Sequence, residues 1–357
     1  MIAPPLLLQL LRQPVQLAGA SLADWDLMLR QAALANLTPA LYHLLAEHGV
    51  LARVPAPARA HLEWARATGE RHAQAVRFEV LKIGQALAGT GVPLLLLKGA
   101  AYAMAGLAPA AGRLFTDIDI LVPKQRLGAV EGALMLAGWA SGHHDAYDQR
   151  YYREWMHELP PMEHIARLSL IDVHHAILPE TAAAHPDPAL LRAAALPIAG
   201  QPGLAMLAPV DMVLHSAVHL FYEGELGHGL RDLFDLHRLL QQFGRAPAFW
   251  RDLPLRAHEL GLSRPLFYAL RYAGRLLHTP IPVEVAEQAE AGRPHPLLLA
   301  LMDRLFDRAL LPAHASCADG YTGSARFLLY VRANWLRMPP LMLARHLFHK
   351  AFITPKR

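Results

Sequence analysis

The sequence predicts an α+β protein in which a small mixed β-sheet lies between helical N-terminal and C-terminal regions. Two observations predict this class. Leucines recur at three- and four-residue spacing in the first and last parts of the chain, as they do in amphipathic helices. Short apolar runs of strand length lie in the middle, and some of them contain carboxylates. We therefore divide the chain into a helical region 1–90, an α/β core 91–178 and a helical region 179–357.

The N-terminal region reads as helices from residue 6 to about residue 90. The longest of these is expected over 58–88, where the apolar residues keep a helical period after a Pro-Ala segment. Gly89 and Gly91 stop this helix, because glycine tolerates the backbone conformation that ends helices. The apolar run 92–97 that follows is the first predicted strand.

The core alternates between the two kinds of element. The first strand ends at Lys98-Gly99, where we expect a turn and a short helix before a second strand, Asp117–Val122. A helix is expected over 124–136. A third strand, Arg167–Ile177, alternates apolar and polar residues, and the aromatic segment Tyr147–His157 reads as a helix or a lid.

From Pro179 onward we expect helices. Two of them lie within Pro209–Phe243, and the others are expected over 263–278, 295–311 and 325–350. The basic, amphipathic end of the chain suits a solvated helix face better than a nucleic-acid or membrane surface. The helix pair within 209–243 carries the polar residues His215, His219, Glu223, Arg231, Asp232 and Asp235.

Composition limits the class of protein. Of the 357 residues, 54% are apolar, which is enough for a large core and too many for a disordered chain. The single cysteine, Cys317, has no disulfide partner within the chain, so we expect a cytoplasmic location. No stretch reaches the roughly 18 to 20 uncharged apolar residues of a transmembrane helix. The net charge of +4 is too mild to indicate nucleic acid, which stays open as a partner.

Carboxylates occupy two of the predicted strands, where burial normally excludes charge. Side chains two residues apart on a strand share a face, so Asp117 and Asp119 converge, and Asp172 shares a face with His174. Carboxylates held together repel one another unless a cation lies between them. Hard oxygen ligands favour Mg²⁺, with Mn²⁺ as an alternative. Three such carboxylates can hold two ions for phosphoryl-type transfer, and Asp172 can help to deprotonate the attacking hydroxyl.

Positive charge for a phosphate chain lies in the turn before these acids. Lys98 and the amides from Gly99 onward begin a predicted helix, and a helix N-terminus is an anion-binding end. Arg113 lies four residues before Asp117 and can bind a second phosphate through its fork-shaped guanidinium, or pair with an aspartate. We therefore take Lys98, Gly99 and Arg113 as candidate binding residues for a nucleotide.

These patterns together resemble a known family. The segment LLKGAAYA, followed by Arg113, Asp117–Val122 and Ile171–His174, resembles the uncharacterised bacterial nucleotidyltransferases of the DNA polymerase β-like superfamily. The resemblance covers about residues 25 to 310. It implies a nucleotidyltransferase-type sheet with Asp117 and Asp119 as the metal-binding pair.

The resemblance also implies a third carboxylate, which falls on Asp172. The activity it implies is Mg²⁺-dependent transfer of a nucleoside monophosphate from an NTP, for which we expect ATP, to an acceptor with release of pyrophosphate. A small molecule, a protein side chain and an RNA end all stay open as the acceptor. Lys98-Gly99 stands where the superfamily usually has Gly-Ser. This departure leaves a second interpretation, a nucleotide-binding or regulatory protein of the same fold without turnover.

The histidines leave a third interpretation, a zinc-dependent hydrolase. His215 and His219 lie one helical turn apart, which suits zinc, but no glutamate lies between them as in HExxH and no third ligand is evident. A polar helix face in which one of them bonds an acid such as Asp235 is the plainer interpretation. We expect Arg231, Asp232 and Asp235 to form ion pairs that dock the helices onto the sheet, with substrate contact as the alternative for Arg231. The candidate accessory residues are therefore His174, His215, His219, Arg231 and Asp235.

Overall fold

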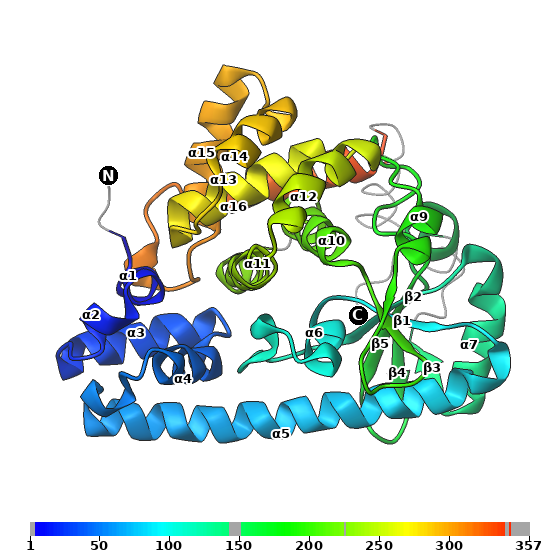
Figure 1. The fold of residues 1–357 in the computed structure, drawn as a ribbon, viewed down its shortest axis with the longest axis horizontal. Helices are drawn as coiled ribbons and strands as arrows, with labels where there is room; N and C mark the ends of the chain where they lie inside the picture. The colour runs from blue at the N-terminus through cyan, green and yellow to red at the C-terminus, as the bar shows by residue number, and fades with distance from the viewer. Residues whose placement is uncertain (1–3, 143–150, 225, 340–342, 344–357) are drawn as a thin grey trace.

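A computed structural model describes residues 4–142, 151–224, 226–339 and 343. It is an α+β structure in which helices flank a mixed sheet, so the predicted fold class is confirmed. The sheet lies at one end of the molecule and the first helices lie at the other, while the C-terminal helices cover both (Figure 1). Among the described residues, no helix is long and apolar enough to cross a membrane.

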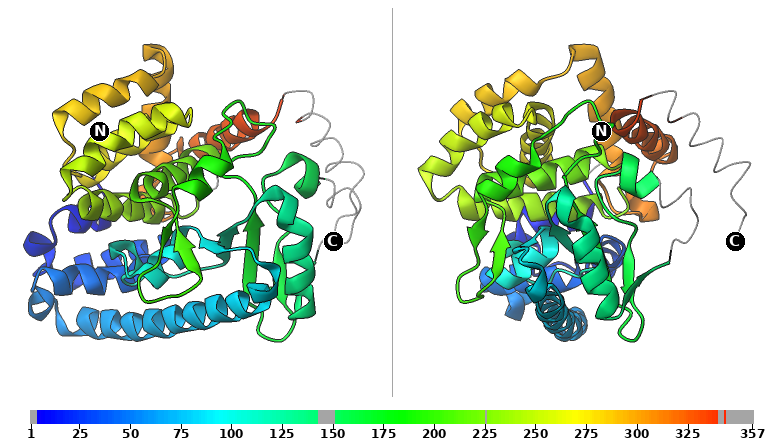
Figure 2. Two further views of the ribbon diagram at one scale, coloured as in Figure 1. Left: turned by 45° about the vertical axis from the view of Figure 1, so that its right-hand side comes forward. Right: turned by 90° about the vertical axis from the view of Figure 1, so that its right-hand side faces the viewer.

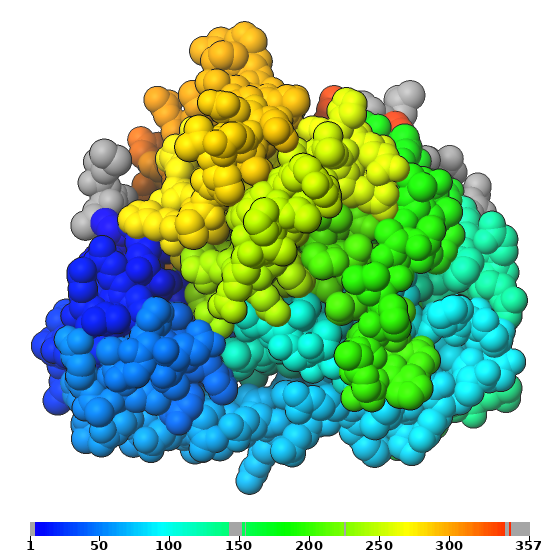
Figure 3. All heavy atoms as spheres, viewed as in Figure 1, coloured from blue at the N-terminus to red at the C-terminus, as the bar shows by residue number. Residues whose placement is uncertain are grey.

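The first part of the chain forms four short helices and one long one. Ser21 caps the third helix by accepting a hydrogen bond from the Asp24 amide. The long helix predicted over 58–88 is confirmed as α5; it lies beneath the sheet (Figure 1) and runs along one edge of the molecule (Figure 3). The bounds are α1 Leu6–Arg12, α2 Pro14–Leu17, α3 Leu22–Leu34, α4 Thr38–Glu47 and α5 Ala56–Leu87.

The sheet has the strand order β3-β4-β5-β2-β1-β7-β6. Its centre is mixed, because β2 pairs antiparallel with β1 and parallel with β5. The strands are β1 Leu94–Leu96, β2 Ile118–Leu121, β3 Trp139–Ser141, β4 Met162–His164, β5 Leu170–His174, β6 Leu196–Pro197 and β7 Leu204–Met206.

The three predicted strands are confirmed as β1, β2 and β5. The prediction that the chain is only helical after Pro179 is wrong, because β6 and β7 form one edge of the sheet. β6 has only two residues, both exposed, and β7 has only three, so both are shorter than the runs from which a strand is recognised in a sequence. The division of the chain into three parts at residues 90 and 178 stays a prediction.

The two faces of the sheet belong to two different cores. On one face, Ile118 and Ile120 pack with residues of α5 and α7 such as Val80 and Val130. On the other, Leu95 and Leu121 join the large core built from the N-terminal and C-terminal helices. Because neighbouring side chains on a strand point to opposite faces, Asp117 and Asp119 lie on the face turned toward the C-terminal helices.

The remaining helices follow the predictions in most places. The pair within 209–243 is confirmed as α10 and α11, and the helices near 263–278 and 295–311 are confirmed as α13 and α15, whereas α9, α12 and α14 were not predicted. Two views show the later helices stacked above the sheet (Figure 2). The bounds are α6 Lys98–Ala105, α7 Leu127–Leu136, α9 Pro188–Ala193, α10 Pro209–Tyr222, α11 Gly229–Phe243, α12 Pro247–Glu259, α13 Ser263–Leu277, α14 Val283–Ala289, α15 Pro296–Ala309 and α16 Thr322–Arg337.

Two predicted helices extend past the described residues. The helix expected over 325–350 corresponds to α16, and its predicted part beyond Arg337 lies mostly outside the described residues. The aromatic segment 147–157 is described from Tyr151, where a π-helical turn covers Tyr151–Trp155; the residues before it lie outside the description.

Gly112 fixes the loop before Arg113 against the start of α4. Its φ is +73°, and a Cβ at this position would overlap the backbone of Pro39. Gly106 has a similar φ of +64°, but a Cβ there would meet nothing within 4 Å.

We therefore predict that Gly112→Ala lowers the free energy of unfolding by more than about 3 kcal/mol, because a backbone clash is added to the left-handed conformation. Gly106→Ala is the matched control and should cost only about 1–2 kcal/mol. Urea unfolding measures both values, and equal losses would contradict this account of Gly112.

Candidate metal and nucleotide site

Three carboxylates meet on the sheet face turned toward α10. Asp119 on β2 is the register partner of Asp172 on β5, and Asp117 comes directly before β2. One oxygen from each of the three lies within 4.8 Å of the others. The parallel pairing of β2 with β5 thus brings together residues that lie more than 50 positions apart in the sequence. Oxygen atoms at this spacing can share a divalent cation.

The surroundings of the three carboxyl groups shift their pKa values in different directions. Burial alone would raise the pKa of Asp119, but the nearby Lys98 charge and a hydrogen bond with His174 outweigh it, so this pKa is lowered. Burial raises the pKa of Asp172 to about 7, and the charge of Asp119 adds to this shift. Burial and the Asp119 charge also raise the pKa of Asp117. Two of the three carboxylates thus lack enough positive charge around them, which fits a site for a cation.

Lys98 lies at the junction between β1 and α6. Its Nζ is 3.6 Å from Asp119, and its side chain is 15% exposed. Burial lowers the Lys98 pKa, but Asp119 and Glu223 more than compensate, so the pKa is raised and the side chain stays charged. The backbone φ of Lys98 is +41°, a conformation that favours glycine. Strain of this kind persists where the surrounding structure imposes it, often at functional sites.

Gly99 lies beneath Arg113 at the first turn of α6. A Cβ on Gly99 would come within 2.6 Å of Arg113 Nη1 and 2.5 Å of the Phe115 ring, so no side chain fits here. Helix α6 has no side-chain cap, and the amides of its first turn lack acceptors within the helix. The three predicted binding residues therefore lie together at one helix N-terminus. Their contact with a nucleotide stays a prediction.

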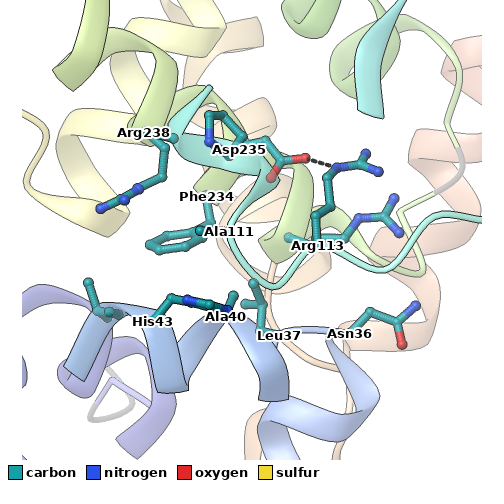
Figure 4. Close-up of a pocket in the computed structure, with 13 residues that line it drawn as sticks. Asn36, Leu37, Ala40, His43, Ala111, Arg113, Phe234, Asp235 and Arg238 are labelled. Carbon is teal, nitrogen blue, oxygen red and sulfur yellow. Dashed lines mark hydrogen bonds and ion pairs between the residues drawn. The ribbon is translucent and has the colours of Figure 1, made fainter. Parts of the chain in front are cut away.

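Arg113 also ties the sheet to α11. Its Nε donates to Asp235 at 2.7 Å, and Figure 4 shows this bond above a pocket lined by α4 and α11. Asp232 lies 4.0 Å from Arg113 and 2.7 Å from Arg231, so the predicted pairing of Arg231 with Asp232 is present, and Arg113 makes the ion pairs that join α11 to the sheet. The pocket in Figure 4 holds only about 10 Å³, room for about one water, so we treat it as a packing gap.

Sequence reasoning missed Glu158 and His157, which lie beside the carboxylates. His174 bonds Asp119 through Nε2 at 2.9 Å and lies 3.2 Å from Glu158 through Nδ1. These contacts raise the pKa of His174 to about 9 against the effect of burial. The His157 ring stacks on His174, and with Glu158 these residues form a second group whose atoms lie close enough for a metal. No strand pattern marked Glu158, which pairs with β5 through a single bridge.

The helix α10 brings His215, His219 and Glu223 toward the same face. His219 bonds Glu223 at 2.9 Å, so the expectation that one of these histidines bonds Asp235 finds no support. His215 is buried, which lowers its pKa well below the usual value. Within the described residues, neither His215 nor His219 belongs to a group that could hold a metal, so the spacing that suggested a zinc hydrolase gains no support.

A mixed sheet that presents clustered carboxylates beside a helix N-terminus has the parts that metal-assisted phosphoryl-type transfer uses. The comparison with protein families identifies the family within the class of proteins that carry out such transfer. A family model described as an uncharacterised nucleotidyltransferase matches residues 21–278, and the chain belongs to this family. The predicted family is confirmed. No match was found among curated proteins or among solved structures.

The raised pKa of Asp172 predicts a pH dependence of the metal-free protein. A carboxyl whose folded pKa is about 7 and whose unfolded pKa is about 3.9 binds more protons when folded, so stability falls as pH rises between these values. We expect EDTA-treated wild type to lose about 1–3 kcal/mol from this group between pH 4 and pH 8.

Asp172→Asn is the matching variant, since it keeps the shape and removes the charge. Its unfolding free energy should vary less over this pH range, and Mg²⁺ should stabilise the wild type more than the variant at pH 8. Chemical unfolding at several pH values tests this, and identical pH profiles for the two proteins would contradict it.

Proposed function

We propose that this nucleotidyltransferase transfers a nucleoside monophosphate from an NTP, with ATP the expected donor, to an acceptor hydroxyl in an Mg²⁺-dependent reaction. The bond from the acceptor oxygen to the α-phosphorus forms, the bond from that phosphorus to the bridging oxygen breaks, and pyrophosphate leaves. The approach of Asp117, Asp119 and Asp172 within 4.8 Å carries the proposal, together with membership of the family.

The carboxylates have distinct roles in this proposal. Asp117 and Asp119 hold the divalent cations, with Mn²⁺ as an alternative to Mg²⁺. Asp172 completes the site and accepts the proton of the acceptor hydroxyl, a role supported by its position directly opposite Asp119 in the pairing of β5 with β2. Bound divalent cations supply charge that offsets the negative charge of the phosphates during transfer. His174 holds Asp119 in place through its hydrogen bond.

The β- and γ-phosphates lie at the start of α6 in this proposal. Support comes from the free first-turn amides, from the charged Lys98 and from Arg113 Nη1, which all border this helix end. Gly99 permits the close approach of Arg113, so a guanidinium occupies the space that a serine side chain would take. This arrangement gives the Lys98-Gly99 turn a way to bind phosphate without the Gly-Ser of the wider superfamily.

A second candidate function is nucleotide binding without turnover. One observation favours it. The Lys98 ammonium lies 3.6 Å from Asp119 and supplies charge where a cation would otherwise be needed. In this case nucleotide would bind in the presence of Mg²⁺, but no pyrophosphate would be released.

The experiment for the proposed function is incubation with the four α-labelled NTPs, Mg²⁺ or Mn²⁺, and cell extract as the source of acceptor. We predict label transfer by wild type, and a loss of at least about 100-fold in Asp117→Asn, because a carboxylate that binds the cations is removed. Asp26→Asn, an exposed acid on α3, is the matched control and should keep full activity.

Equal transfer by wild type and Asp117→Asn would end the catalytic assignment. Nucleotide binding by wild type without release of pyrophosphate would instead support the second candidate.

A further inference from the structure

A cavity of about 280 Å³ opens beside Asp117, at the edge of the sheet where β2 and β5 begin. Helix α5 forms one wall, through Ala75 and Val76 among others. The segments that lead into β2 and β5 form the other walls, through Phe115 and Leu170. Asp117 itself lines the cavity, and one of its carboxylate oxygens lies within 4.8 Å of oxygens of Asp119 and Asp172. The cavity therefore reaches the carboxylate group from the β5 side.

The cavity and α6 lie on opposite sides of the carboxylates, which suggests where the acceptor of the reaction binds. Strand β1 lies on one side of β2 and β5 on the other, and α6 begins directly after β1. Displacement at phosphorus is in line, so the attacking group and the leaving pyrophosphate lie on opposite sides of the α-phosphorus. If the pyrophosphate leaves at α6, the attacking hydroxyl comes from the β5 side. That side carries Asp172, the proposed proton acceptor, and the mouth of the cavity.

The walls of the cavity indicate the kind of molecule it accepts. Arg167 and Glu79 form a 2.6 Å ion pair there, and Ser169 donates its hydroxyl to the same glutamate. His72 is held by the backbone of Phe115. The charges of Arg167 and Glu79 offset each other, so the charge that remains on the lining of the cavity is the Asp117 carboxylate, beside apolar and aromatic patches. Its volume lies near the lower limit for small-molecule sites, which is room for about one ring system.

The rim of the cavity is strained. Leu168 has a φ of +59°, which is rare for a leucine, and its side chain is 70% exposed. An apolar side chain is normally buried, yet the Leu168 side chain stays exposed to solvent at the mouth of the cavity. A ligand in the cavity would cover it.

We propose that this cavity is the acceptor site, and that the acceptor is a small uncharged molecule with one ring system and a hydroxyl directed at Asp172. The proposal rests on the proposed function, since it names the acceptor class of the same reaction. It disfavours an RNA end, because Arg167 on these walls is paired with Glu79 and the phosphates of RNA would meet no net positive charge.

Ala75→Trp tests this proposal, because Ala75 is exposed on α5 and an indole there fills the cavity without entering the core. Gln74→Trp is the matched control: it adds the same side chain one residue away, at an exposed position that does not line the cavity. Both variants are assayed with α-labelled NTP and cell extract separated into low-mass and macromolecular fractions. MgATP affinity and the release of labelled NMP to water are measured in parallel.

We expect wild type and Gln74→Trp to label a compound in the low-mass fraction. Ala75→Trp should transfer at least about tenfold less, while its MgATP affinity and its transfer to water stay within about twofold of wild type. Thermal melting checks the fold, and Ala75→Leu replaces the variant if the tryptophan prevents folding.

Undiminished transfer by Ala75→Trp would overturn the acceptor site while leaving the proposed function in place. A matching loss of MgATP affinity would assign the cavity to the donor nucleotide instead, and label found only in macromolecules would overturn the acceptor class. A wild type that releases no pyrophosphate under any condition would overturn the proposed function itself, and the acceptor site with it.

Discussion

The parallel pairing of β2 with β5 is the constraint on which the candidate site depends. It sets Asp119 directly opposite Asp172 and leaves Asp117 at the start of the same face. A shift of one residue in this register would turn Asp172 into the core formed with α5 and α7. The apolar residues that alternate with the acids, such as Ile118 and Ile171, hold the register because they must stay in that core. Packing on one face of the sheet therefore positions chemistry on the other.

The charges around the carboxylates are balanced unevenly. Lys98 and His174 both contact Asp119, whereas Asp172 and Asp117 keep raised pKa values. The structure thus holds a net negative site in a partly buried place, which costs stability in the absence of a cation. Lys98, which stabilises Asp119, also lies at the start of α6, where the phosphates of the nucleotide are proposed to bind. One lysine therefore serves both the acidic site and the helix end.

Sequence reasoning predicted the parts of the site that follow from the chain's local geometry. The period of two along β2 placed Asp117 and Asp119 together, and the Lys98-Gly99 turn marked the helix end. Contacts between different helices and strands were harder to predict from the sequence. Arg113 pairs with Asp235 on α11, and Glu158 meets His174 through one isolated bridge, and neither contact has a spacing that a sequence reveals. The cavity beside Asp117 depends on how α5 crosses the sheet, which only tertiary packing determines.

The central claim is that Asp117, Asp119 and Asp172 hold divalent cations beside a nucleotide. The most direct test is anomalous diffraction from crystals grown with Mn²⁺ and a non-hydrolysable ATP analogue. The account predicts Mn²⁺ bound by these three carboxylates, with the phosphate chain at the start of α6. Crystals that show the analogue without Mn²⁺ at these carboxylates, or Mn²⁺ held by His157, Glu158 and His174 in their place, would contradict it.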